Sequence, residues 1–138
     1  MKVTGLKSDR LYNLKVSDYL IDWNRAREVS RPQALVKQFL YPFWKGCVVL
    51  EETRIPASRL RIDLMNLSRR QIVEVSPSSS HSFNRFFHKD RFRLGRAVQR
   101  DLDKVAWAER NRFTYVELTE EDIDNLSIAL FRERGVEL

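Results

Sequence analysis

The stretch "LRIDLMNLSRRQIVEV", residues 60–75, contains two short apolar runs separated by a polar turn. Alternating apolar side chains on both sides of a short polar connection are typical of a β-hairpin. Each run carries one carboxylate among apolar neighbours, Asp63 in the first and Glu74 in the second. The two acids can share one face of such a hairpin, because neighbouring strands lie about 4.8 Å apart.

Two carboxylates at that separation repel each other unless a cation lies between them. A divalent metal is the usual solution, and Mg²⁺ is typically held by one or two carboxylates together with phosphate and water. The residues leave an alternative open. On a solvent-exposed sheet face, Asp63 and Glu74 would simply pair with Arg61 or Arg70.

The segments around this hairpin predict a mixed α/β fold in a single domain, residues 1–138. Residues 1–18 are polar and basic and are expected to form an arm or a short strand. "SRPQALVKQFLYPFW" predicts a helix that Ser30 caps and that Pro42 ends or kinks. The remaining elements are expected as a helix over 17–29, a strand over 47–55, a long helix from 91 to about 110, a strand over 113–118 and a helix over 119–134.

The long helix over 91–110 carries Leu94, Val98, Leu102 and Val105 on one stripe, which we expect to face the core. Asp101 falls inside this stripe, about 20° from Leu94, and Lys104 falls at its edge. A charge on a core-facing stripe is unfavourable unless it is paired or used. Alternatively, Asp101 and Lys104 form an ordinary helical ion pair. Asp103 is expected to point to solvent.

The charge favours a polyanionic partner, because the chain has a net charge of +6 and a pI near 9.8. "HSFNRFFHKDRFR", residues 81–93, interleaves cations with phenylalanines, a pattern that suits phosphate contact and base stacking. The alternative is that some of these rings anchor the helix start in the core.

Cys47 is the single cysteine, so no disulfide forms within this chain. Apolar runs too short to span a bilayer and no signal-peptide core predict a cytoplasmic protein.

The order helix, "RID", turn, "IVEV", loop to His81, then "RDLDKVAWAERNRFTYVEL", resembles the PD-(D/E)XK nuclease superfamily. The resemblance is strongest to its branch of very-short-patch-repair-like enzymes, which includes phage and homing endonucleases, and it covers roughly residues 30–126. It implies a restriction-endonuclease-like fold and a Mg²⁺- or Mn²⁺-dependent endonuclease. The implied reaction is hydrolysis of phosphodiester bonds in DNA, with a duplex as the expected substrate and a 5′-phosphate as the product. A homodimer is one way for so short a chain to read a long target.

The resemblance also assigns roles to individual residues. Asp63 resembles the central metal-binding aspartate, and Glu74 the second acid, with the Val75 carbonyl as a further ligand. His81 resembles a general acid or base near the scissile phosphate. Asp101 and Lys104 resemble a pair that supports the site or contacts phosphate. The residues expected to bind nucleic acid are Arg61, Arg85, Lys89, Arg91 and Arg93.

Two positions depart from the superfamily pattern. A lysine often follows two residues after the second acid, where this chain has Ser76, and Lys104 is the candidate to replace its charge. The first helix often carries a glutamate, where this chain has Gln33; Glu28 is the second choice. These departures keep a second function open, namely a catalytically inactive nucleic-acid-binding module on the same fold.

Overall fold

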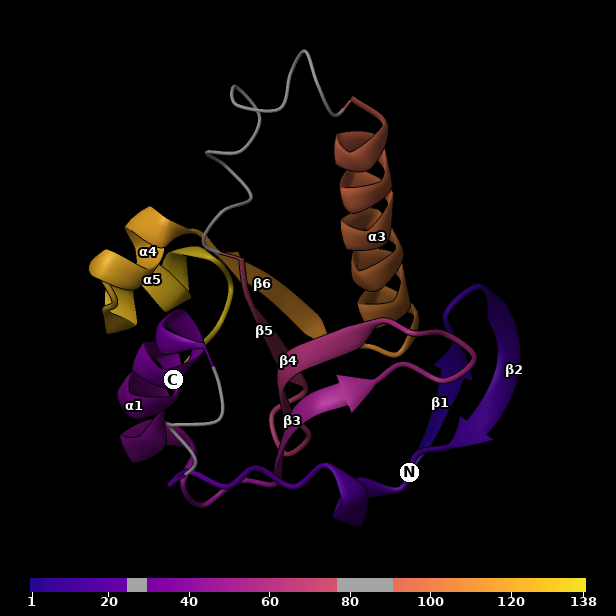
Figure 1. Ribbon diagram of the computed structural model, residues 1–138. Helices are drawn as coiled ribbons and strands as arrows, with labels where there is room; N and C mark the ends of the chain where they lie inside the picture. Colours follow the sequence, from indigo (N-terminus) through magenta and orange to yellow (C-terminus); the bar gives the residue numbers. More distant parts are fainter. Residues whose placement is uncertain (25–29, 77–90) are drawn as a thin grey trace.

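The computed structural model describes residues 1–24, 30–76 and 91–138, and for residues 91–97 it describes the backbone alone. Its centre is a four-stranded sheet in the order β3-β4-β5-β6 (Figure 1). The strands are β3 (Val49–Arg54), β4 (Arg61–Asn66), β5 (Gln71–Val75) and β6 (Thr114–Leu118). The first three pair antiparallel, and β6 lies parallel to β5. The predicted hairpin and mixed sheet are therefore confirmed, with bounds shifted by one or two residues.

Helices cover both faces of this sheet (Figure 1). One face packs on α1 (Arg31–Trp44), α4 (Glu120–Asp124) and α5 (Ile128–Glu133). The other face packs on α3 (Arg91–Arg110) and on the hairpin of β1 (Lys2–Gly5) and β2 (Ser8–Asn13). Alternation along the strands separates the two cores, so that Leu64 and Val73 face α1 while Met65 and Ile72 face α3.

Helix α1 begins as the sequence predicts. The Ser30 hydroxyl accepts a hydrogen bond from the Gln33 N–H at 3.4 Å, and Pro32 lies in the first turn. Pro42 does not end the helix but lies inside it. The helix continues for two more residues to Trp44, whose ring is fully buried against the sheet. Burial of this large side chain outweighs the hydrogen bond that a proline cannot donate.

The helix predicted over 17–29 is wrong for its described part. Val16–Asp18 forms a single 3₁₀ turn, named η1, and the chain then runs along the edge of the sheet. Leu20 forms an isolated antiparallel bridge with Leu50, and the Ile21 N–H donates to the Val49 carbonyl at 3.0 Å. Pairing with the open edge of β3 therefore replaces helical hydrogen bonds here. Residues 25–29 lie outside the described residues.

The face of α3 that meets the sheet also differs from the prediction. Val98 and Leu102 are exposed by 49% and 58%, whereas Trp107 and Ala108 are fully buried. The Trp107 indole N–H donates to the Thr4 carbonyl at 2.8 Å, which fixes the rotation of the helix about its axis. This rotation turns the side of Lys104 toward the sheet and turns Val98 and Leu102 of the predicted stripe toward solvent.

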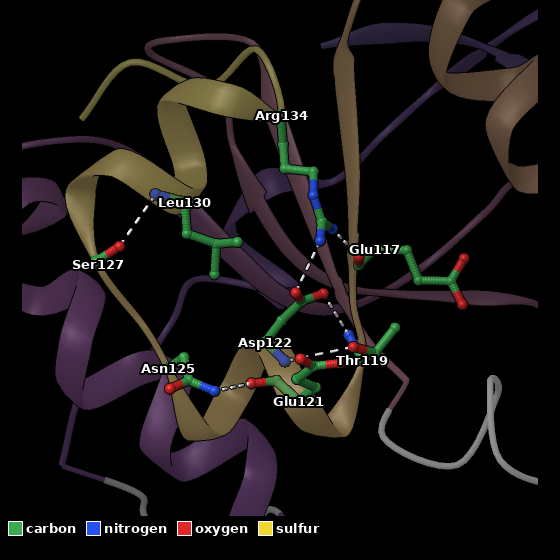
Figure 2. Close-up of polar contacts among 8 residues, drawn as sticks. All are labelled: Glu117, Thr119, Glu121, Asp122, Asn125, Ser127, Leu130 and Arg134. Atoms are coloured by element: carbon green, nitrogen blue, oxygen red, sulfur yellow. Dashed lines mark hydrogen bonds and ion pairs between the residues drawn. The ribbon is translucent and has the colours of Figure 1, made fainter.

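The helix predicted over 119–134 is divided into α4 and α5, because Ser127 caps a new helix by accepting from the Leu130 N–H at 3.1 Å (Figure 2). Thr119 caps α4. Its hydroxyl accepts from the Asp122 N–H, and the Asp122 carboxylate accepts in return from the Thr119 N–H. The Arg134 guanidinium adds a contact of 2.7 Å to the same carboxylate, so one acid joins both helices (Figure 2).

The N-terminal residues form the β1–β2 hairpin, which docks on the C-terminal half of α3. The Asn111 side chain accepts from the Thr4 N–H at 3.0 Å, and the Arg110 guanidinium donates to the Gly5 carbonyl at 3.2 Å. Asp103, expected to face solvent, points to this hairpin with its side chain only 17% exposed. It lies 3.7 Å from the Lys7 ammonium.

No helix in the described ranges is long and apolar enough to cross a membrane.

Candidate functional site

Asp63 lies at the point where β4 and β5 stop pairing. The ladder between the two strands runs from Asn66–Gln71 to Leu64–Val73 and does not extend to Asp63. The Asp63 carboxylate instead accepts a hydrogen bond from the Val75 N–H, with 2.8 Å between Oδ2 and N. A side chain thus replaces a main-chain partner, and the two strands are free to part beside the carboxylate.

The strand on the other side of Asp63 is distorted at the same level. The pairs Glu51–Leu64 and Thr53–Ile62 place Glu52 opposite Asp63, but that pair is missing from the ladder. Glu52 has a φ of 53°, in the left-handed region that side chains with a Cβ rarely adopt. Such a conformation costs about 1 to 3 kcal/mol and persists where the surroundings impose it, often at functional sites. Both neighbours of Asp63 therefore depart from regular strand geometry.

Glu74 is a buried carboxyl beside Asp63, only 2% exposed. Its Oε1 atom makes no hydrogen bond in the described residues, although the Lys104 ammonium lies 3.5 Å away. Burial, the Asp63 charge and a hydrogen bond with the Asp63 side chain raise the pKa of Glu74 to about 9, against the opposing effect of Lys104. At neutral pH the acid pair of the chain alone therefore carries a proton on Glu74.

Helix α3 brings the ammonium group of Lys104 to this pair, because Trp107 fixes the rotation of the helix. Lys104 approaches Glu74 with its side chain 18% exposed, and Asp101 is half-buried one turn earlier. Lys104 thus approaches Glu74, with 3.5 Å between the ammonium nitrogen and Oε1, and the helical ion pair with Asp101 that was the alternative is not formed among the described residues. Lys104 therefore lies near one strand acid, and Asp101 lies near enough to Tyr115 for its charge to raise the pKa of that phenol.

Strand β6 contributes two residues that the sequence reasoning missed. Its parallel register sets Tyr115 beside Ile72 and Glu117 beside Glu74, so both lie on the face that carries the acid pair. Burial raises the pKa of the Tyr115 phenol above its ordinary value, and the charges of Glu74, Glu117, Asp101 and Asp63 raise it further. Tyr115 is therefore a neutral hydrogen-bond donor among acids. Alternation along "TYVEL" places Tyr115 and Glu117 on the same face of the strand. The sequence does not show which residues of β5 they lie beside, because no local pattern specifies the register between the two strands.

The other predicted residues are distributed as follows. Arg61 is exposed at the start of β4, two residues before Asp63 and on the same face. Val75 is half-buried, with its N–H held by Asp63. His81, Arg85, Lys89 and Glu28 lie outside the described residues, as do the side chains of Arg91 and Arg93.

Gln33 does not join the acid pair. Its side-chain amide donates to Glu51 at 3.2 Å, and Lys37 makes a buried ion pair with the same carboxylate at 2.9 Å. Glu51 pairs across the sheet with Leu64, whose side chain faces α1. This polar cluster therefore lies on the opposite face of the sheet from Glu74.

The donor set fits a magnesium-type ion better than a zinc-type ion. Carboxylate oxygens are hard ligands, and one of them, Glu74 Oε1, is buried without a hydrogen bond in the described residues. Within the described ranges no three His, Cys, Asp or Glu side chains gather closely enough to hold a metal by themselves. Two carboxylates remain sufficient for Mg²⁺, which usually keeps water and phosphate as its other ligands.

Comparisons with protein-family models, with curated proteins and with solved structures give no significant match.

Proposed function

We propose that this chain is a metal-dependent DNA endonuclease of the PD-(D/E)XK type, with a restriction-endonuclease-like fold. The observation that carries the proposal is the acid pair on the paired strands β4 and β5, in which Glu74 is only 2% exposed and Asp63 is held by the Val75 N–H. The element order supports it as well. A helix, three antiparallel strands, a second helix and a strand parallel to the third set the two acids on the middle strands.

A divalent cation would offset the repulsion between the two carboxylates more fully than a single proton does. It would replace the proton on Glu74, take up the Oε1 atom that lacks a hydrogen bond, and stabilise both carboxylates in their charged forms. When bound, such an ion activates water and offsets the charge that develops on a phosphate during hydrolysis. Asp63 and Glu74 are the residues that would hold Mg²⁺ or Mn²⁺.

The remaining side chains suit the same chemistry. Lys104 supplies, from α3, the positive charge that Ser76 cannot supply at the usual position, and it can contact phosphate while it offsets Glu74. The Tyr115 phenol remains protonated and can donate a hydrogen bond to a phosphate oxygen. His81 remains the candidate for proton transfer. The net charge of +6 suits DNA as the substrate. We further propose that the chain acts in the cytoplasm as a homodimer, as an enzyme of the phage or homing type.

The second candidate function is a nucleic-acid-binding module that has lost catalysis. Two observations favour it, namely Ser76 at the usual lysine position and the use of Gln33 in the buried cluster with Glu51. It predicts DNA binding that requires no metal and is unchanged in Asp63→Asn.

Cleavage of supercoiled plasmid distinguishes the two functions. Purified protein is incubated with Mg²⁺, with Mn²⁺ or with EDTA, beside Asp63→Asn and the control Glu109→Gln, which alters an exposed acid on α3. Asparagine keeps an oxygen that can accept from the Val75 N–H, so the strand geometry is retained. We expect metal-dependent nicking that falls about 100-fold or more in Asp63→Asn and is unchanged in Glu109→Gln. Equal cleavage by Asp63→Asn would refute the proposed site.

A further inference from the structure

Two arginines face each other where β3 and β4 join. Arg54 and Arg61 are directly opposite partners in the antiparallel ladder, and both are exposed. Like charges directly opposite each other destabilise a sheet. The Arg54 guanidinium donates to the Ser58 carbonyl at 2.7 Å, but neither arginine forms an ion pair with an acid in the described part of the chain. Folding alone does not account for this pair of charges.

The turn beyond these arginines meets the N-terminal hairpin. The Leu6 N–H donates to the Pro56 carbonyl at 3.3 Å, and Figure 1 shows the β3–β4 turn reaching β1. Residues 1–15 and 54–61 together carry seven Lys or Arg residues and a single acid, Asp9. We call this surface the arginine corner, and its exposed cations near the two turns are Lys7, Arg10, Arg54, Arg59 and Arg61.

The arginine corner is rigidly connected to the acid pair. Arg61 and Asp63 lie on one face of β4, and two residues along a strand span about 6.7 Å. The hairpin is held to α3 by the hydrogen bonds of Trp107 and Arg110, and the same helix carries Lys104. A molecule bound at the corner therefore has a fixed position relative to the acid pair.

We propose that the arginine corner binds the phosphate backbone of duplex DNA next to the position where the acid pair acts. The inference rests on the proposed function. A polyanion relieves the repulsion between Arg54 and Arg61, and guanidinium groups bind phosphate with paired hydrogen bonds. The cations are spread over two adjoining turns, which suits the broad backbone of a duplex better than a single extended strand.

The test measures binding and stability together, in EDTA so that no cleavage occurs. The affinity of a fluorescent DNA duplex is measured by anisotropy across a series of salt concentrations for wild type, Arg61→Gln and Arg54→Gln/Arg61→Gln. Lys45→Gln is the control, since Lys45 is an exposed cation at the end of α1. We expect the slope of log K against log salt to fall by about 0.9 for each phosphate that a variant no longer neutralises.

Thermal unfolding separates a binding role from a structural one. Neutralising Arg61 should leave the Tm unchanged or raise it, because the repulsion of Arg54 is removed, while DNA affinity falls. Corner variants that bind the duplex as tightly as Lys45→Gln does, or that lose affinity only in proportion to a lower Tm, would overturn the inference. Corner dependence seen only with single-stranded DNA or with RNA would overturn the assignment to duplex DNA.

The two proposals fail in different ways. If wild type cuts DNA with Mg²⁺ but the corner variants bind as wild type does, the corner inference fails and the endonuclease stands. If the duplex binds through the corner but no metal supports cleavage, the endonuclease fails and the corner stands.

Discussion

The Lys104 ammonium on α3 lies 3.5 Å from the buried Oε1 atom of Glu74 on β5, without forming a hydrogen bond to it. This contact joins the strand that carries the second acid to the helix that carries the predicted lysine. It also explains how a chain with Ser76 after its second acid can keep a positive charge at the site. The charge comes from a helix, at a position that the rotation of α3 about Trp107 determines.

Replacing Lys104 tests this relationship. Lys104→Met removes the charge and retains an apolar stem, so Glu74 becomes harder to ionise. We expect metal-dependent cleavage to fall roughly 100-fold and its pH profile to move to higher pH, while Lys104→Arg retains much of the activity. The measurement is the single-turnover rate from about pH 6 to about pH 9, a range that ends where Glu74 titrates. Unchanged turnover in Lys104→Met would exclude a role for this charge.

Glu74 gives the stability of the chain a pH dependence of known sign. The pKa of Glu74 is about 9 in the folded chain and 4.5 in a free glutamate, so between these values the unfolded chain binds fewer protons. Stability must therefore fall as pH rises through this window, by at most about 1.4 kcal/mol per pH unit from this group. Urea unfolding in EDTA, at a series of pH values across this window, should show the decline in wild type but not in Glu74→Gln. Parallel pH dependence in the two proteins would contradict the assignment.

The buried ion pair on the other face of the sheet should matter for stability alone. Lys37 and Glu51 are 2.9 Å apart, with side chains 3% and 9% exposed. Lys37→Met leaves the Glu51 carboxylate buried without its cation and should cost about 3 to 5 kcal/mol. Lys37→Met/Glu51→Leu should recover most of this loss in urea unfolding. A double variant as unstable as the single one would show that Lys37 acts through other contacts, such as its hydrogen bond to the Asp22 carbonyl.

Asp122 is a second partly buried acid, and its contribution to stability changes with pH in the opposite direction to that of Glu74. Burial opposes its ionisation, but hydrogen bonds from Thr119 and the Arg134 guanidinium hold the pKa of Asp122 below its usual range. Asp122→Asn should therefore cost about 1 kcal/mol at neutral pH, and this difference should shrink as the pH falls below about 4. DNA cleavage should be unaffected. A loss of cleavage with intact folding would place α4 within the site, contrary to its position beside α1.

Much of this arrangement can be predicted from the sequence, because alternation and capping are local signals. The positions of Asp63 and Glu74 on neighbouring strands follow from period-two patterns, and Ser30 and Thr119 mark helix starts. The facing of α3 could not be predicted in this way. In a helical wheel the predicted stripe has more apolar residues than the side that carries Trp107 and Ala108. The side that meets the sheet is nevertheless determined by the buried Trp107 indole, which donates a hydrogen bond to the Thr4 carbonyl.

The parts that depend on long-range pairing were also out of reach. The edge of β3 draws residues 19–21 into an extended path, although their composition suits a helix. The parallel register of β6 brings Tyr115 and Glu117 beside Glu74, and no local pattern specifies a register. Sequence reasoning therefore missed Tyr115 and Glu117, because both lie on β6, which reaches the site through the long connection that contains α3.

Titration calorimetry with Mn²⁺ tests the central claim most directly, because it asks whether the acid pair is a cation site. Measured at neutral pH in two buffers of different ionisation enthalpy, it reports both affinity and protons released. We predict saturable binding with release of about one proton, since Glu74 must lose its proton to act as a ligand. Asp63→Asn should bind more than about tenfold more weakly, since even outer-shell partners contribute about 10- to 100-fold. Binding that is absent in wild type, or unchanged in Asp63→Asn, would contradict the account.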